Sequence, residues 1–286
     1  MVDKRAAVLG SPIKHSLSPY LHRAAYAAMG LDGWRYGAAE CDEARLPALL
    51  AAIGSGEPVP GLPPGGPWAG LSLTMPLKRA VLPLVDTVSA LAVEVGGANT
   101  VVFRDGAAHG DNTDVYGIER ALAEAGVPAP SGALVLGGGA TAASALAALR
   151  NLGLGAATLV VRDRSRAGET AAVAERLGVA LRVEQFDKLE ALLDVDLVIS
   201  TLPGGAADVF APSLRGVPAL FDVVYSPWPT SAAQAVLRAG GTVVGGFEML
   251  LHQAVRQVEL MTGHADVPVE AMRAAGEAEI ARRAGL

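Results

Sequence analysis

The chain has 286 residues, of which 51% are hydrophobic and 18% are charged, and its formal net charge is −6. This much apolar material excludes an intrinsically disordered chain, and the length corresponds to two domains or one large α/β domain. The negative charge, with no basic cluster, argues against nucleic acid as a partner. Cys41 is the only cysteine, which excludes an intrachain disulfide and fits a reducing cytoplasm.

Every long apolar run is interrupted by glycine, proline or charge before the roughly 18 residues that a membrane-spanning helix needs. The N-terminus enters a strand-like run directly after three charged residues, and no secretory signal is visible. We therefore expect a cytoplasmic protein with no membrane partner. The sequence leaves open whether the protein is a monomer or a homodimer.

The first half alternates short apolar runs with alanine-rich stretches. Strands are predicted at residues 6–9, 34–39 and 70–74, and helices at residues 19–29 and 43–53. Residues 54–67 are rich in glycine and proline and read as a loop. Alternation of strand and helix predicts parallel pairing through crossover helices. Whether residues 101–103 pair with the strand at 70–74 stays open.

The second half shows a clearer alternation. Strands are predicted at residues 133–136, 157–161, 196–200, 219–223 and 242–244, and helices at 141–152, at 166–177 and after residue 246. Such a βαβ series forms a doubly wound parallel sheet. We place a domain boundary near residue 115, with an α/β domain over residues 1–114 that helices of about 248–286 complete. Residues 115–247 then form a Rossmann-like domain.

A glycine-rich turn joins the first predicted strand of this second domain to its helix. Gly137 and Gly139 have no Cβ, so a pyrophosphate can approach the backbone and the helix N-terminus. Ala142 is the small residue that close packing of helix on strand needs. The alternative is a tight turn that requires glycine for its own geometry. The strand before it and the helix after it favour dinucleotide binding.

The end of the next strand bears on the choice between NAD and NADP. Arg162, Arg164 and Arg166 surround Asp163 in "VVRDRSRA". Guanidinium groups bind a 2′-phosphate, whereas a carboxylate binds the ribose 2′-hydroxyl. We therefore predict NADP, and NAD is the less favoured alternative, which requires Asp163 to face the ribose. A solvated run of charges is the third interpretation.

Polar residues gather at a few points of the first half. Ser16 and Ser18 precede the helix that Pro19 starts, although Ser18 alone would serve as a helix N-cap. Thr74 ends a strand, and Lys78 follows one helical turn later. An ammonium at a strand end can transfer a proton to a carbonyl if a carboxylate lies nearby. Most lysines, however, are simply solvated.

Two further segments, "GGANT" and "GDNTDVYG", supply Asn99, Asn112, Thr113 and Asp114. Asn and Asp are ordinarily turn formers, but Asp114 lies at the predicted domain junction, where ligand clefts form. Paired with Lys78, it would give a proton-transfer couple. The five histidines show no metal-ligand spacing, so no metal site is predicted, and the absence of a G-x-S-x-G motif leaves a serine hydrolase unsupported.

Over nearly its whole length the chain resembles the shikimate dehydrogenase family. The resemblance is carried, in order, by "GSPIKHSLSPYLH", "LTMPLK", "GGANT", "GDNTDVYG", the glycine loop, "FDVVYSPWPT" and "GGFEMLLHQA". It implies an NADP-dependent, reversible reduction of 3-dehydroshikimate to shikimate in the biosynthesis of chorismate and aromatic amino acids. It also implies an active site in the cleft between the two domains.

Carried over by position, the resemblance assigns roles to individual residues. Lys78 and Asp114 are implied as catalytic residues. The implied substrate contacts are Ser16, Ser18, Thr74, Asn99, Tyr225 and Gln253. The implied cofactor contacts are Gly137, Gly138, Gly139, Ala140, Thr141, Arg162, Arg166, Val223, Gly246 and Met249.

The sequence departs from the family pattern at several positions. Ser72 and Arg23 stand where the family usually has asparagine, and Val161, Arg162 and Asp163 replace an asparagine–arginine–threonine triplet. Residues 200–203 replace a block normally rich in Asn-Ala-Thr-Pro. These departures keep alternatives open: a quinate/shikimate or aminoshikimate dehydrogenase that uses NAD, or a non-catalytic nucleotide or metabolite sensor on the same fold.

Overall fold

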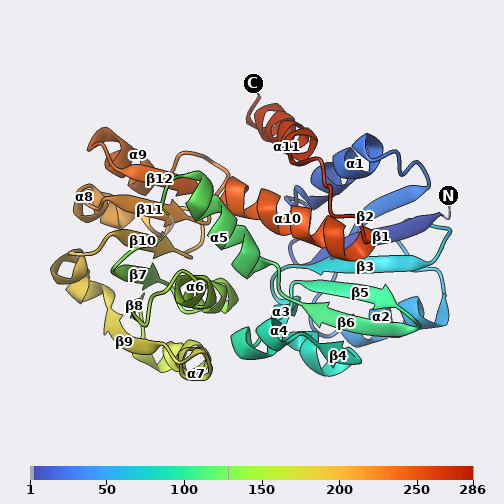
Figure 1. Ribbon diagram of the computed structural model, residues 1–286, viewed down its shortest axis with the longest axis horizontal. Coiled ribbons are helices and arrows are strands. Elements are labelled where there is room, and N and C mark those ends of the chain that lie inside the picture. Colours follow the sequence, from blue (N-terminus) through green and yellow to red (C-terminus); the bar gives the residue numbers. More distant parts are fainter. Residues whose placement is uncertain (1–2, 128, 286) are drawn as a thin grey trace. The chain divides into compact units, whose positions relative to one another are not determined.

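The computed structural model describes residues 3–127 and 129–285, and the chain divides into two compact units (Figure 1). Unit 1 comprises residues 1–113 and 253–286, and unit 2 comprises residues 114–252. The chain leaves unit 2 within a helix, α10 (Gly246–Thr262), whose first seven residues belong to unit 2. Each unit has its own six-stranded sheet.

The sheet of unit 1 is mixed. Its strand order is β2-β1-β3-β5-β6-β4, and the strands span β1 (Lys4–Gly10), β2 (Trp34–Glu40), β3 (Trp68–Leu73), β4 (Thr87–Val88), β5 (Thr100–Arg104) and β6 (Ala107–Asp111). The predicted strands in this half are confirmed, and β1 pairs parallel with β2 and β3. Strand β5, whose pairing the sequence left open, runs antiparallel to both β3 and β6.

A two-residue turn explains the antiparallel part of this sheet. Asp105 and Gly106 join β5 to β6, and both have positive φ, 53° and 78°. An Asp-Gly pair with two positive φ angles is the turn that closes a hairpin. Two strands joined by so short a turn need no crossover helix, so β5 and β6 pair antiparallel. Of residues 101–103, Val101 and Val102 do pair with the predicted strand at 70–74, and they do so in antiparallel register.

Helices complete unit 1. They are α1 (Ser18–Ala28), α2 (Leu46–Ser55), α3 (Leu77–Ala80), α4 (Ala90–Val95), α11 (Val269–Ala284) and a short 3₁₀ helix η1 (Leu82–Leu84). Helix α11 packs beside α1, although the two are separated by most of the sequence (Figure 1). One apolar cluster on this sheet contains Leu9, Leu46, Leu71 and Leu77, all fully buried.

The sheet of unit 2 is entirely parallel. Its strand order is β12-β11-β10-β7-β8-β9, and the strands span β7 (Ala133–Leu136), β8 (Ala156–Val161), β9 (Ala180–Gln185), β10 (Leu197–Ser200), β11 (Ala219–Asp222) and β12 (Thr242–Gly245). This is the doubly wound order of a dinucleotide-binding sheet, with the winding reversed between β7 and β10. The predicted Rossmann-like fold is confirmed.

The helices of unit 2 alternate with its strands. They are α5 (Asp114–Glu124), α6 (Ala140–Asn151), α7 (Gly168–Leu177), α8 (Ala211–Leu214) and α9 (Ser231–Arg238), with 3₁₀ helices η2 (Arg164–Ala167), η3 (Phe186–Leu192) and η4 (Asp208–Phe210). The alanines of α6 after Ala140 are fully buried, so this helix packs closely. Within the described residues, no helix is both long and apolar enough to cross a bilayer.

Candidate active site

A buried polar network in unit 1 surrounds Asn99. The Asn99 side chain donates from Nδ2 to Oε1 of Gln253 at 3.1 Å and to Oγ1 of Thr113 at 3.0 Å. Its Oδ1 accepts the backbone N–H of Thr113 at 2.8 Å. All three side chains are at most 7% exposed. The structure therefore brings together two predicted substrate residues, Asn99 and Gln253, that are 154 positions apart.

The network continues through Ser72 and through three residues that were not predicted from the sequence, Tyr36, Thr100 and Gln257. Gln257, one turn after Gln253 on α10, donates from Nε2 to the backbone oxygen of Asn99 at 3.2 Å and to Oγ1 of Thr100 at 3.1 Å. Its Oε1 accepts a hydrogen bond from the Ser72 hydroxyl at 2.7 Å. The Tyr36 hydroxyl in turn donates to Oγ of Ser72 at 2.6 Å.

Gly70 allows α10 to lie this close to the sheet. A Cβ on Gly70 would come within 2.7 Å of Cγ of Met261 on α10 and within 2.6 Å of the Val101 carbonyl oxygen. Helix and strand therefore approach more closely than any larger residue permits. The approach places the amides of α10 within hydrogen-bond distance of β3 and β5.

The two predicted serines lie where α1 begins. The backbone N–H of Ser18 donates to Oγ of Ser16 at 3.3 Å. The cap position is Leu17, and no side chain caps this helix, so the interpretation of Ser18 as a simple N-cap is wrong. The Ser18 hydroxyl instead hydrogen-bonds to Tyr36. Burial raises the pKa of Tyr36 well above its ordinary value, and the bonds to Ser72 and Ser18 oppose that rise.

Backbone hydrogen bonds place Thr74 and Lys78 beside the Asn99 segment. The N–H of Leu73 donates to the Asn99 carbonyl at 2.7 Å, and the N–H of Ala98 donates to the Lys78 carbonyl at 2.7 Å. Lys78 lies in the single turn of α3 and is half-buried. These bonds bring the segments of Thr74, Lys78 and Asn99 together within unit 1.

Asp114 begins α5 and is 3% exposed. It is the first residue of unit 2, and Lys78 belongs to unit 1. In the segment before Asp114, the Asn112 side chain donates from Nδ2 to the Gly97 carbonyl oxygen at 2.8 Å. That bond fixes the polypeptide leading into α5.

The glycine loop of unit 2 has the geometry of a nucleotide-binding turn. Gly137 has φ +98°, and a Cβ there would lie 2.7 Å from Oγ1 of Thr201. The Thr170 hydroxyl donates to the Gly138 carbonyl at 2.8 Å and holds the loop from α7. Helix α6 begins after Gly139 with no side-chain cap. Its N-terminus follows β7, at the switch point of the sheet, where such folds bind dinucleotides.

The arginines after β8 differ in their surroundings. Arg164 forms an ion pair with Glu184. Hydrogen bonds from Arg182 and Arg164 lower the pKa of that carboxyl. Asp163 caps η2, since its Oδ1 accepts the N–H of Ser165 at 2.9 Å. Arg162 is exposed. The side chain of Arg166 lies outside the part of the chain that the structure describes.

Of the remaining predicted cofactor residues, Val223 and Gly246 are in contact. A Cβ on Gly246 would lie 1.9 Å from the Val223 carbonyl oxygen, so only glycine fits between β11 and the start of α10. Met249 is 7% exposed. Tyr225, a predicted substrate residue, is half-buried in the loop after β11 and belongs to unit 2.

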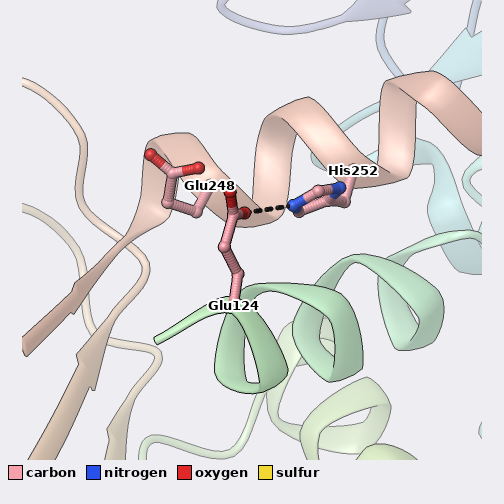
Figure 2. Close-up of side chains that lie close together, drawn as sticks. All are labelled: Glu124, Glu248 and His252. Atoms are coloured by element: carbon pink, nitrogen blue, oxygen red, sulfur yellow. Dashed lines mark hydrogen bonds and ion pairs between the residues drawn. The ribbon is translucent and has the colours of Figure 1, made fainter. Parts of the chain in front are cut away.

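A cluster of Glu124, Glu248 and His252 was not predicted from the sequence. Figure 2 shows Glu124 at the end of α5 facing the two α10 residues. Nε2 of His252 lies 2.7 Å from Oε2 of Glu124. The only signal in the sequence is the spacing of four residues between Glu248 and His252, because Glu124 lies on another helix.

Comparison with known proteins identifies the family. Residues 8–101 match the shikimate dehydrogenase substrate binding domain, and residues 246–275 match the shikimate 5'-dehydrogenase C-terminal domain. A Synechococcus sp. (strain JA-3-3Ab) protein named shikimate dehydrogenase (NADP(+)) is 34% identical, over 96% of this chain and 94% of its own length. A Caulobacter vibrioides protein of the same name is 37% identical, over 94% and 95%.

Solved structures agree. The crystal structure of Mycobacterium tuberculosis shikimate dehydrogenase is 42% identical with a TM-score of 0.85, covering 96% of this chain and 99% of that one. That of the Thermus thermophilus enzyme, in complex with NADP(H) and shikimate, is 31% identical with a TM-score of 0.82, covering 97% and 99%. The chain belongs to the shikimate dehydrogenase family.

Two departures from the shikimate dehydrogenase pattern have structural partners. Ser72 bridges the Tyr36 hydroxyl and Gln257, so it continues the network around Asn99. Arg23 donates from Nε and Nη2 to the Tyr36 carbonyl at 3.0 and 2.7 Å. Both substitutions therefore support Tyr36, one through its hydroxyl and one through its backbone.

Proposed function

We propose that this chain catalyses the NADP-dependent, reversible reduction of 3-dehydroshikimate to shikimate, a step toward chorismate and the aromatic amino acids. The observation that carries the proposal is the buried Asn99–Gln253 pair, together with Lys78, in a chain whose full-length relatives are named shikimate dehydrogenase (NADP(+)). Unit 1 is then the substrate domain, and unit 2 is the dinucleotide-binding domain. The enzyme works in the cytoplasm, which the lone, buried Cys41 supports.

The substrate is bound by polar side chains. In this proposal Ser16 and Ser18 bind the carboxylate, since two hydroxyls on one short segment can donate to its two oxygens. The amides of Asn99 and Gln253, the hydroxyl of Thr74 and that of Tyr225 bind the ring hydroxyls. The Asn99 and Gln253 side chains are already hydrogen-bonded to each other, so they are oriented before substrate arrives.

Proton transfer falls to Lys78 and Asp114. In the reductive direction Lys78 polarises the ketone oxygen at C3 and gives it a proton. In the oxidative direction its amine accepts the proton of the 3-hydroxyl. Asp114 stabilises the charged ammonium and binds the neighbouring hydroxyl of the substrate. A sensor protein would need neither residue, so their presence favours an enzyme.

The glycine loop of unit 2 fits a dinucleotide. Gly137, Gly138 and Gly139 have no side chains to keep a pyrophosphate from the backbone, and the N–H groups of Ala140 and Thr141 at the start of α6 are proposed to bind it. Bound NADPH supplies the hydride. Val223, Gly246 and Met249 are proposed to contact the nicotinamide side of the cofactor.

The choice of NADP over NAD rests on Arg162. One oxygen of the Asp163 carboxylate caps η2, so this side chain is engaged within its own loop. Arg162, exposed at the end of β8, is then placed to bind a 2′-phosphate, with Arg166 as the second arginine. The NAD-dependent quinate/shikimate or aminoshikimate dehydrogenase is the second candidate.

The test is the initial rate of nicotinamide reduction, followed by absorbance, with shikimate plus NADP⁺ and separately plus NAD⁺. Quinate is assayed in parallel with both cofactors. We expect shikimate with NADP⁺ to give the highest kcat/KM by a wide margin. Comparable rates with NAD⁺, or efficient oxidation of quinate, would assign the chain to the second candidate. No turnover by folded protein that still binds nucleotide would indicate a sensor.

A further inference from the structure

One cluster of ionisable side chains plays no part in the proposed reaction. Glu248 and His252 project from the first two turns of α10, and Glu124 projects toward them from the end of α5 (Figure 2). All three residues belong to unit 2. One nitrogen or carboxylate oxygen from each lies within 4.8 Å of the others.

Burial distinguishes the three side chains. The side chain of His252 is 7% exposed, whereas that of Glu124 is 47% exposed, and Glu248 is of intermediate exposure. The imidazole is therefore held between the helices, and its Nε2 faces the Oε2 atom of Glu124 at 2.7 Å. The two more exposed carboxylates can adjust around this fixed nitrogen. One rigid imidazole and two adjustable carboxylates make a preorganised but tolerant ligand set.

Charge favours a cation at this point. Two carboxylates face one imidazole, so the cluster carries net negative charge whether or not the ring is protonated. Glu124 is also the last residue of α5, where the partial negative charge of the helix end makes a carboxylate unfavourable. A divalent cation at this position would offset both contributions.

We propose that Glu124, Glu248 and His252 bind one divalent transition-metal ion, best matched by Zn²⁺. Zinc binds histidine nitrogen and carboxylate oxygen at about 2.0–2.2 Å, which places ligand atoms at separations that small rotations of the two carboxylates can reach. An imidazole ligand favours Zn²⁺ over Mg²⁺ or Ca²⁺, which prefer oxygen alone. Such an ion would join the end of α5 to the start of α10.

The experiment is a titration of the full chain with Zn²⁺, monitored by isothermal calorimetry and by NMR of the histidine ring nitrogens. We expect one Zn²⁺ per chain and a change of the His252 ring signals at saturation. Glu248→Gln keeps the size of the side chain but removes its charge, and it should weaken binding by about tenfold or more. Glu124→Gln should weaken binding similarly, and His252→Gln should abolish it.

The matched control is Glu259→Gln, a carboxylate later on α10 that pairs with Arg256 and should bind Zn²⁺ as the unmodified chain does. His264→Gln controls for binding at an exposed histidine. If His252→Gln fails to fold, the Zn²⁺ affinities of Glu124→Gln and Glu248→Gln test the proposal, because neither substitution opens a cavity. No Zn²⁺ binding, unchanged affinity in both carboxylate variants, or displacement of Zn²⁺ by equimolar Mg²⁺ or Ca²⁺ would overturn the proposal.

Discussion

Lys78 is the residue on which proton transfer depends in the proposed reaction. Replacing it with alanine removes the group that polarises the ketone, while the hydroxyls and amides that bind the substrate remain. We expect kcat to fall by about 10²- to 10⁴-fold with little change in the KM for shikimate. Lys188→Ala, at an exposed position of η3, is the matched control. Near-normal turnover of Lys78→Ala would exclude the catalytic assignment.

His22 gives unit 1 a defined response to acid. It is fully buried, stacked on Tyr36 at 4.0 Å, and its Nδ1 lies 2.9 Å from the Ser18 carbonyl. Burial lowers the pKa of His22 from 6.5 to about 4. In the unfolded chain His22 is protonated below pH 6.5, whereas in the folded chain it stays neutral down to about pH 4. The free energy of unfolding therefore falls as pH falls through this window.

The expected loss is about 2 kcal/mol of the free energy of unfolding between pH 7 and pH 5, at 1.36 kcal/mol for each pH unit below 6.5. Urea unfolding at the two pH values measures it. His22→Gln should be less stable at pH 7 but should lose less on acidification than the unmodified chain. His264→Gln, at an exposed position, should retain the full loss. An equal loss in His22→Gln would refute the assignment to this residue.

At the scale of elements, helix α11 supports the segment that carries Ser16 and Ser18. Arg283 donates to the His15 carbonyl at 2.7 Å and to the Ser16 carbonyl at 3.4 Å. Glu279, one turn earlier and 4% exposed, holds that guanidinium. Hydrogen bonds from Arg282 and Arg283 lower the pKa of Glu279 to about 2, so the carboxylate stays charged in neutral solution. The C-terminal helix thereby fixes the backbone of the segment that carries Ser16 and Ser18.

Replacing Arg283 with alanine should therefore affect substrate binding more than turnover. We expect the KM for shikimate to rise about tenfold, the effect of losing about 1.4 kcal/mol of binding energy, with kcat within about threefold and the KM for NADP⁺ unchanged. Arg282→Ala is the control, because Arg282 bonds to Glu279 but not to the loop. A similar rise in KM in both variants would mean that the whole helix, and not the Arg283 contact, is responsible.

Sequence patterns predict elements well where one physical signal dominates. Strand β7 is predicted with its observed ends because its four residues form a continuous apolar run that is buried throughout. Strand β9 is missed because Arg182 and Glu184 interrupt its apolar pattern at the edge of the sheet. The β5–β6 hairpin is missed because Asp105 and Gly106 were not read as a turn, although their sequence is typical of one.

The same distinction holds for the candidate site. Asn99 and Gln253 are found through family motifs, but their supporting partners are not. Gln257 reaches Ser72 across 185 positions, and Glu124 reaches His252 across 128. Contacts of this kind depend on how helices pack on sheets, and no local periodicity reports them.

At the scale of the whole molecule, the proposed ligand residues divide between two units with separate sheets. Unit 1 contains Lys78 and all the proposed substrate residues except Tyr225 and Asp114, whereas the glycine loop and Arg162 belong to unit 2. A ligand that binds the folded state lowers the rate at which the amides around it open and exchange. Each ligand should therefore slow hydrogen exchange in a different part of the chain.

Hydrogen exchange of the intact protein, followed by mass spectrometry, tests this division. We expect NADP⁺ alone to slow exchange in the segment from β7 into α6 and at the start of η2. Shikimate alone should slow exchange in the segments that contain Ser18, Thr74 and Asn99, and in α10 around Gln253. Because the proposed ligand residues are distributed in this way, protection of the Asn99 segment by NADP⁺ alone, with none in the glycine loop, would contradict the proposed roles of the two units.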